Sequence, residues 1–253
     1  MANNKNYLEF LDIPDGSGGT ERWHAKDAEA QASIAQVASA IGYDADYEFV
    51  DLGLPSGTLW AKCNVGATTE TGYGNYYMYG KGATQYVNGD TPYAGTENPL
   101  AAAADTATQV LGEIWHMPTQ AQFEELLANT TSTWETNFNG SGVNGRKYTA
   151  ANGNYIFIPA AGYYYNGSKS SENTACGNWT SSPAQQNGEA RFLYANANNQ
   201  GFGNDAYKSG RSVRGVMDSN PYDITKKADK SELPTYATPA ECRAIVTGYT
   251  PSE

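Results

Sequence analysis

The sequence predicts an α+β domain that has few helices and many short strands. Glycine and tyrosine are abundant, at 27 and 19 of 253 residues, and short aromatic runs alternate with Gly- and Asn-rich turns. Charged residues make up 17% of the chain, below the share of about a quarter that is usual in soluble domains. Binding loops use this mixture of Tyr, Gly, Asn and Ser, although a loop-rich β protein without a binding role has the same composition.

The globular domain is expected over residues 43–217. Its predicted strands are short, aromatic or β-branched runs bounded by turn residues, at 47–52, 58–62, 73–79, 146–150, 154–158, 160–165, 190–195 and 212–216. An Ala-rich run predicts a helix over 101–111. A second helix is predicted over 119–129, because Thr119 and Gln122 have the spacing of a capping box ahead of an apolar stripe.

Residues 1–42 have a different pattern. A Gly-rich turn at 15–19 precedes a series of apolar or small residues that are spaced alternately by four and three: Trp23, Asp27, Ala30, Ile34, Val37 and Ile41. This is the repeat of about 3.5 residues found in coiled coils, and it predicts a short helical oligomerisation stub that ends at Gly42. An amphipathic helix packed on the domain is the alternative.

Residues 218–253 are polar and contain several Lys and Pro residues. We expect a C-terminal extension or linker here, not a further domain. Residues 240–246 have the pattern of one short helix.

Charge and hydropathy exclude several classes of protein. The net charge is −11, from 27 acidic and 16 basic residues, which argues against a nucleic-acid partner because such a protein needs a basic face. No apolar run reaches about 18 residues, so no membrane insertion is expected. Residues 1–10 lack the apolar core of a secretion signal. The distant Cys63, Cys176 and Cys242 favour free thiols over one long-range disulfide.

The sequence offers little catalytic chemistry. Its two histidines are His24 and His116, and neither lies in a nucleophile or metal-site motif. His116 comes just before the second predicted helix, where an orienting or packing role is expected. Glu124 and Glu125 are expected on the solvated face of that helix. We therefore expect no enzyme activity, no cofactor and no metal.

The stretch EFVDLGLPSGTLWAKCNVGA at 48–67 resembles the opening of a known domain family. More pieces of the same pattern follow in order: YG at 73–74 with Tyr76, WHMPT at 115–119, GVNG at 142–145 with Lys147, IFIPAAGY at 156–163, WTSS at 179–182 and SVRGV at 212–216. The series is similar to the Fibrobacter succinogenes major paralogous domain of gut Bacteroidetes and their phages. Over roughly 48–216, this resemblance implies a C-type lectin fold in the branch shared with formylglycine-generating-enzyme-like proteins.

The active motifs of that fold are not matched. Sulfatase-modifying members use a cysteine pair, whereas the cysteines here lie in other contexts. Calcium-dependent sugar-binding members carry an EPN or WND motif, whereas Trp179 lies between Asn178 and Thr180. The resemblance thus implies the scaffold without either chemistry.

In a subset of the family, the last part of the fold is the variable region of a diversity-generating retroelement that mutates Asn-type codons. The corresponding region here is about 190–216. Eight residues of the types that such variation produces are the predicted ligand contacts: Tyr194, Asn196, Asn198, Asn199, Phe202, Asn204, Asp205 and Tyr207. Tyr163, Tyr164, Tyr165 and Asn178 are secondary candidates. The alternative is that Asn and Gly only form turns here.

Residues 1–42 also resemble the start of phage tail or head-fibre proteins, in which a short strand and a turn lead into a trimeric helix. The two resemblances imply a virion appendage protein that is assembled in the host cytoplasm. It would join other virion proteins through 1–42, form a homotrimer and bind a host-surface glycan or protein. The alternatives are a bacterial surface adhesin-like domain and a virion decoration protein without a receptor role.

Overall fold

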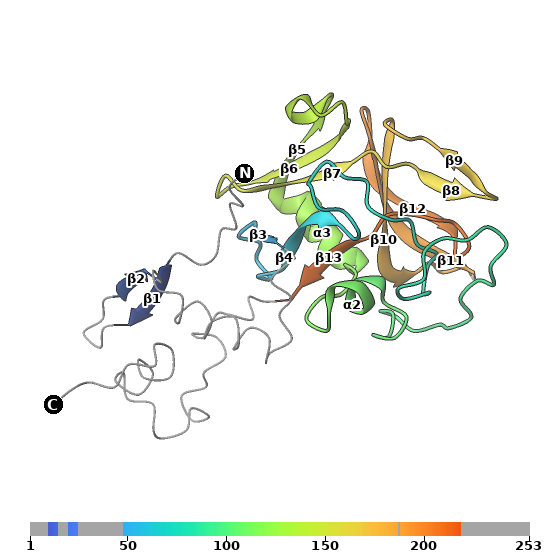
Figure 1. Cartoon of the computed structure of the whole chain (residues 1–253), viewed down its shortest axis with the longest axis horizontal. Helices are drawn as coiled ribbons and strands as arrows, with labels where there is room; N and C mark the ends of the chain where they lie inside the picture. Colours follow the sequence, from blue (N-terminus) through green and yellow to red (C-terminus); the bar gives the residue numbers. More distant parts are fainter. Residues whose placement is uncertain (1–9, 15–19, 25–47, 187, 219–253) are drawn as a thin grey trace, which may run out of the picture. The chain divides into compact units, whose positions relative to one another are not determined.

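The computed structural model describes residues 10–14, 20–24, 48–186 and 188–218. The chain divides into two compact units, of which the larger is Asp46–Tyr222. The regular structure in the described part of this unit is mostly β-strand, together with two α-helices and one 3-10 turn: α2 (Thr106–Leu111), α3 (Gln120–Asn129) and η1 (Phe138–Gly140). This composition, shown in Figure 1, is compatible with the predicted α+β class and equally with a mostly-β class.

The strands of the larger unit pair in antiparallel sheets. One sheet has the order β13–β4–β3, from Arg214–Met217, Leu59–Asn64 and Phe49–Asp51. The second is β5–β6–β7, from Thr130–Glu135, Gly145–Ala150 and Tyr155–Pro159. The third is β10–β11–β12, from Ala175–Pro183, Glu189–Asn196 and Gln200–Ala206. A hairpin joins β8 (Tyr163–Tyr165) to β9 (Ser168–Ser170).

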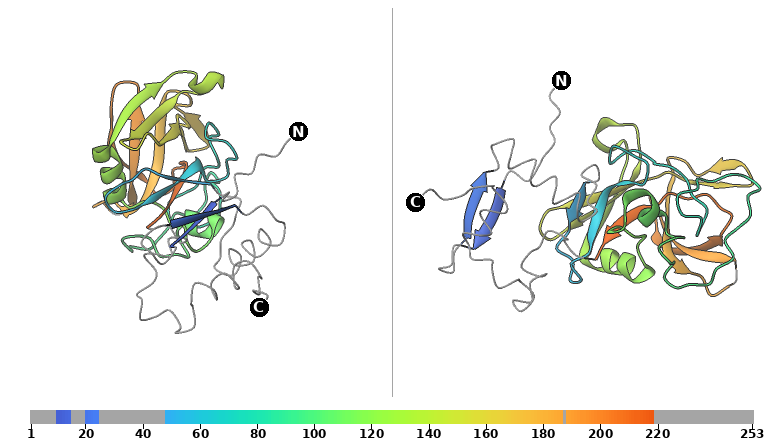
Figure 2. Two further views of the ribbon diagram at one scale, coloured as in Figure 1. Left: turned by 90° about the vertical axis from the view of Figure 1, so that its left-hand side faces the viewer. Right: turned by 60° about the horizontal axis from the view of Figure 1, so that its bottom comes forward.

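Two apolar clusters hold these elements together. α3 packs against β5, β6, β10 and β11 in the middle of the unit (Figure 1). The first cluster includes Phe123 of α3 and Trp60, whose ring centroids lie 5.0 Å apart. α2 packs on β13 beside the second cluster, which includes Trp115, Trp179 and Tyr79. The β8–β9 and β11–β12 hairpins lie at the same end of the unit (Figures 1 and 2), and this end carries the candidate site.

Both predicted helices are present, with one boundary changed. The capping box of α3 is confirmed, because Thr119 Oγ1 accepts from the Gln122 N–H at 3.2 Å and Gln122 Oε1 accepts from the Thr119 N–H at 2.9 Å. The first helix begins at Thr106 and not at residue 101. Asp105 sets this start by accepting the Thr108 N–H at 2.9 Å, which satisfies a backbone donor that the helix leaves unpaired.

The strand prediction over 73–79 is wrong. This segment passes through the core as an irregular chain. Its backbone N–H groups form individual hydrogen bonds to other segments and not the continuous ladder of a strand. Tyr77 N donates to Arg211 O at 2.9 Å, and Tyr79 N donates to Tyr207 O at 3.0 Å. The aromatic run that predicted a strand fills the core instead, since Tyr77 and Tyr79 are buried.

Four strands in the described part of the larger unit were not predicted as such: β5, β9, β10 and β12. β12 is a Gly- and Asn-rich run of the kind that predicts turns. It is a strand because each residue from Gln200 to Ala206 has a partner on β11. Pairing between strands, and not local propensity, decides this element.

The smaller unit contains a hairpin of β1 (Phe10–Pro14) and β2 (Thr20–His24). Trp23 pairs with Leu11 in this hairpin, so the coiled-coil seam does not begin at Trp23 as predicted. The structure does not describe the remaining seam positions, Gly42 or the predicted extension beyond Asp218.

Neither helix of the described part of the larger unit has the length and apolarity that a membrane span requires.

Candidate binding site

The hairpin of β11 and β12 carries seven of the eight predicted contact residues, and Tyr207 follows it. Side chains on neighbouring positions of a strand point to opposite faces. Tyr194 pairs with Gly201, and Leu193 pairs with Phe202, so Tyr194 and Phe202 lie on opposite faces of the hairpin. The structure thus divides the predicted contacts between two faces and the turn, and does not collect them on one face.

The face of Phe202 is largely part of the scaffold. Phe202 is partly buried against the cluster that contains Leu193 and Trp60. Asn204 on the same face is exposed, and its Oδ1 accepts from Arg191 Nη1 at 2.9 Å. Of the predicted contacts on this face, Asn204 is the exposed one.

The turn of the hairpin contains three predicted contacts with different roles. Asn196 Oδ1 accepts the backbone N–H groups of Asn198 and Asn199 at 2.9 and 2.8 Å. Asn196 thus shapes the turn, as the turn-forming alternative predicts. Asn198 and Asn199 are exposed at its tip, where their side chains are free to meet a partner.

Asp205 anchors a buried cation on the other face. Its Oδ2 accepts from Arg211 Nε at 2.9 Å and from Nη2 at 2.5 Å, while Oδ1 accepts from the Ser209 hydroxyl at 2.8 Å. The Arg211 side chain is 7% exposed, and burial lowers the pKa of its guanidinium although the Asp205 carboxylate opposes this shift. Asp205 is therefore primarily the counter-ion of Arg211.

A hollow of about 290 Å³ opens beside this ion pair. We call it the aromatic hollow, and its lining residues are Gly162, Tyr163, Ser171, Ala175, Cys176, Phe192, Tyr194 and Arg211. The guanidinium carbon of Arg211 lies 3.4 Å from the centre of the Phe192 ring and 4.8 Å from that of Tyr163. The tip residue Asn196 donates from Nδ2 to the Tyr194 hydroxyl, which links the hollow to the turn.

Two glycines allow this packing. A Cβ at Gly203 would lie 2.6 Å from the Phe192 ring, and a Cβ at Gly177 would lie 2.4 Å from Arg211 Nη1. Both distances are shorter than real Cβ contacts, so a side chain at either position would displace Phe192 or Arg211 from its place.

Tyr207 does not belong to an exposed face, which corrects the prediction. Its side chain is 6% exposed, and its ring stacks on Tyr79 with 4.7 Å between centroids. Burial raises the pKa of its phenol. Tyr207 therefore supports the core beneath the site.

The secondary candidates also differ from one another in burial and in the contacts that they make. Asn178 is fully buried, where its Nδ2 donates to Asn64 Oδ1 at 3.2 Å, so it is a core residue. Tyr164 stacks on Tyr86 with 5.3 Å between centroids. Tyr165 is 40% exposed, and the Lys208 ammonium lies 5.0 Å from its ring centre. Among these, only Tyr163 lines the aromatic hollow.

Arg211 and Phe192 are site residues that the sequence did not indicate. An Arg in a run of Ser and Gly has the pattern of an exposed loop residue. Its burial depends on Asp205, six positions earlier, and on rings from β8 and β11. Local patterns carry no signal for such a contact.

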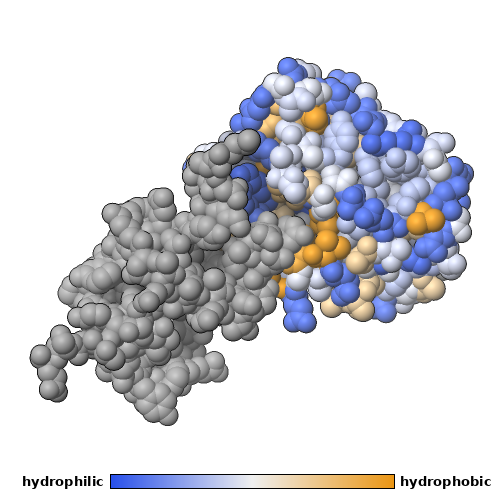
Figure 3. All heavy atoms as spheres, in the orientation of Figure 1, coloured by the Kyte–Doolittle hydropathy of each residue, from blue (hydrophilic) through white to orange (hydrophobic). Residues whose placement is uncertain are grey.

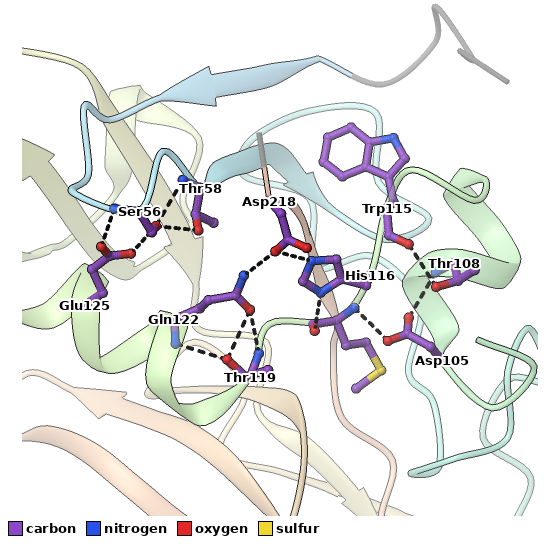
Figure 4. A network of polar contacts seen from close by, with 11 residues as sticks. Ser56, Thr58, Asp105, Thr108, Trp115, His116, Thr119, Gln122, Glu125 and Asp218 are labelled. Carbon is purple, nitrogen blue, oxygen red and sulfur yellow. Dashed lines mark hydrogen bonds and ion pairs between the residues drawn. The ribbon is translucent and has the colours of Figure 1, made fainter. Parts of the chain in front are cut away.

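His116 lies in a separate polar network near the N-termini of both helices (Figure 4). Its Nε2 contacts Asp218 Oδ1 at 2.9 Å, and its Nδ1 contacts Met117 O at 2.9 Å. Gln122 Nε2 also donates to Asp218 Oδ1, at 3.0 Å. The network fixes the end of β13 to the start of α3, which agrees with an orienting role for His116.

The carboxylates near this network are also structural. Asp105 accepts the Met117 N–H at 2.8 Å in addition to capping α2. Glu125 accepts the N–H and the hydroxyl of Ser56 at 2.8 and 2.6 Å, so it fastens the turn before β4 and is not merely solvated. Across residues 48–186 and 188–218, no group of three or more His, Cys, Asp or Glu side chains is placed to hold a metal ion.

The face of the molecule in Figure 3 is largely hydrophilic or neutral in its described part, with small apolar spots. No family model, curated protein or solved structure matches the chain.

Proposed function

We propose that the larger unit is a receptor-binding domain of a phage virion appendage, with a C-type lectin fold, that binds host-surface molecules. The contact region is the aromatic hollow together with the tip of the β11–β12 hairpin. The observation that carries the proposal is the position of this hollow. Its lining residue Tyr194 is hydrogen-bonded to Asn196, which shapes the turn that exposes Asn198 and Asn199. This turn lies in the region where the resembling family varies its residues.

Two further features support this function. The ordered motifs over 48–216 resemble those of the family, and the two helices and short sheets of the described fold are compatible with the scaffold that this resemblance implies. Ligand sites are commonly hollows lined by aromatic side chains with a few polar groups, and this description fits the aromatic hollow.

Modest affinity at each site is sufficient for attachment. If residues 1–42 form a trimer on the particle, three sites act on one cell surface, and avidity increases the overall affinity by orders of magnitude. A binding site of this kind needs little area, so an extended apolar face is unnecessary.

The test is binding of the purified full chain to bacterial cells, starting with gut Bacteroidetes. We expect the paired change Asn198→Ala and Asn199→Ala to weaken cell binding at least about fivefold, since contact residues at the centre of an interface dominate its energy. The matched control is the pair Thr131→Ala and Thr133→Ala, two exposed positions on β5.

A protein that binds no cells would refute the receptor role, and a decoration protein without a receptor would then be the better interpretation. Tip variants that bind like the control pair would refute the assignment of the contact to the hairpin tip.

A further inference from the structure

The aromatic hollow is lined by a buried guanidinium that the fold uses only in part. Arg211 directs Nε and Nη2 to Asp205. Its third nitrogen, Nη1, makes no hydrogen bond to any residue in the described part of the chain, and it lies against Gly177. Arg211 lines the hollow, and Nη1 carries the N–H donors of this side chain that remain for an acceptor placed there.

The charge of this donor is already balanced. Asp205 lies 2.5 Å from Nη2, and both side chains are largely buried. A second carboxylate at Nη1 would approach Asp205 and meet like-charge repulsion, in a chain whose net charge is −11. A neutral acceptor, such as a hydroxyl, takes the Nη1 hydrogen bond without that repulsion.

The walls of the hollow select the shape of the ligand. Tyr163 and Tyr194 are half-buried and present rings, while Ala175 and Gly162 add apolar surface. A flat ring that has an apolar face and hydroxyl groups at its edge satisfies both the walls and the donor. A volume of about 290 Å³ accommodates one such ring.

We propose that the aromatic hollow binds one neutral pyranose unit of a host-surface glycan, with a hydroxyl oxygen accepting from Arg211 Nη1. This inference rests on the proposed receptor function. Of the possible host-surface partners, this binding mode favours a glycan over a protein, and a neutral sugar over an acidic one. Asp205 then contributes to specificity, because its carboxylate already balances the charge of Arg211 and repels a second carboxylate in the hollow.

The direct test is ligand-observed NMR of the full chain with neutral methyl pyranosides and with methyl uronic acid glycosides. A single ring of this size is expected to bind with a Kd on the order of 1 mM. The neutral glycosides should give saturation transfer, and the uronic acids should give at least about fivefold less. Preference for the uronic acids, or no saturation transfer from any glycoside, would overturn the inference.

Two variants locate the binding. Arg211→Lys keeps the positive charge beside Asp205 and removes the Nη1 donors, and Tyr163→Leu keeps bulk and removes a ring. Each should reduce neutral-sugar binding at least about tenfold. The control is Tyr165→Leu on the same strand, because Tyr165 is exposed outside the hollow. Thermal melts establish that each variant is folded, and equal binding by Tyr163→Leu and Tyr165→Leu would contradict the inference.

The variant Asp205→Asn tests the charge argument. Asn keeps an oxygen acceptor for Arg211 but removes the counter-charge, so the hollow should then bind the uronic acids at least as well as the neutral glycosides. Unchanged selectivity in a folded Asp205→Asn protein would refute the role of Asp205. A chain that binds cells but no sugar keeps the receptor function and loses this inference. A chain that binds neither loses both.

Discussion

The ion pair of Asp205 and Arg211 makes a strong prediction about stability. Asp205→Ala removes the acceptor of both Arg211 nitrogens, and the guanidinium, 7% exposed, stays in place without a counter-ion. Breaking a buried pair from one side costs about 3–5 kcal/mol, because an uncompensated buried charge remains. The same change also removes the acceptor of the Ser209 hydroxyl. We expect the free energy of unfolding to fall by about 3–5 kcal/mol.

Urea denaturation measures this change directly, and a thermal melt provides a second measurement. For a domain of this size each kcal/mol shifts the melting temperature by about 2–4 °C, so a loss of roughly 6–20 °C is expected. The double variant Asp205→Ala with Arg211→Met has no buried charge. It should therefore be less destabilised than the sum of the two single variants by at least about 1.5 kcal/mol. A loss below about 1 kcal/mol for Asp205→Ala, or strict additivity, would refute the idea that Asp205 serves as the counter-ion.

Three further predictions concern buried positions. Gly203→Ala places a Cβ 2.6 Å from the Phe192 ring and should destabilise by about 1–3 kcal/mol in urea, with recovery when Phe192→Leu is added. Arg214→Lys should lower the free energy of unfolding by about 2–4 kcal/mol, because fully buried Arg214 donates to Ala61 O and Phe157 O at 3.0 and 2.7 Å. A measured loss below about 1 kcal/mol would contradict this. Burial raises the pKa of Cys176 from 9.0 to about 12, so the unfolded chain loses this proton first as pH rises. Stability should then fall by up to about 1.4 kcal/mol per pH unit between these values, and Cys176→Ala should reduce that slope in urea titrations.

The elements that could be predicted from the sequence are those in which neighbouring residues carry both the structural preference and the boundary. The capping box of Thr119 and Gln122 located α3 to within one residue of its start. The strands β6, β7 and β11 were predicted close to their observed bounds, because their aromatic and β-branched runs are flanked by turn residues. In these segments the local preference and the tertiary structure agree.

Other elements depend on contacts between distant segments. β12 is Gly-rich and forms a strand because each of its residues pairs with a residue of β11. The run 73–79 has strand-forming residues but serves as core filling, with backbone partners that come from 207 and 211. No local pattern of hydrophobic residues distinguishes these outcomes.

The candidate site was predictable by region and not by residue role. The hairpin tip is exposed at Asn198 and Asn199, as expected of contact residues. Asp205 and Tyr207 have the residue types of a contact surface, but one pairs with Arg211 and the other stacks on Tyr79. Residue type alone does not separate a binding Tyr or Asp from a buried one, because both roles use the same chemistry.

The claim that the aromatic hollow is the receptor site is tested most directly by one titration. Fluorescently labelled full chain is added to receptive bacterial cells, as wild type, Arg211→Lys and Tyr165→Leu. The account predicts saturable binding of the wild type and of Tyr165→Leu, and at least about tenfold weaker binding of folded Arg211→Lys. Equal binding of all three proteins would contradict it.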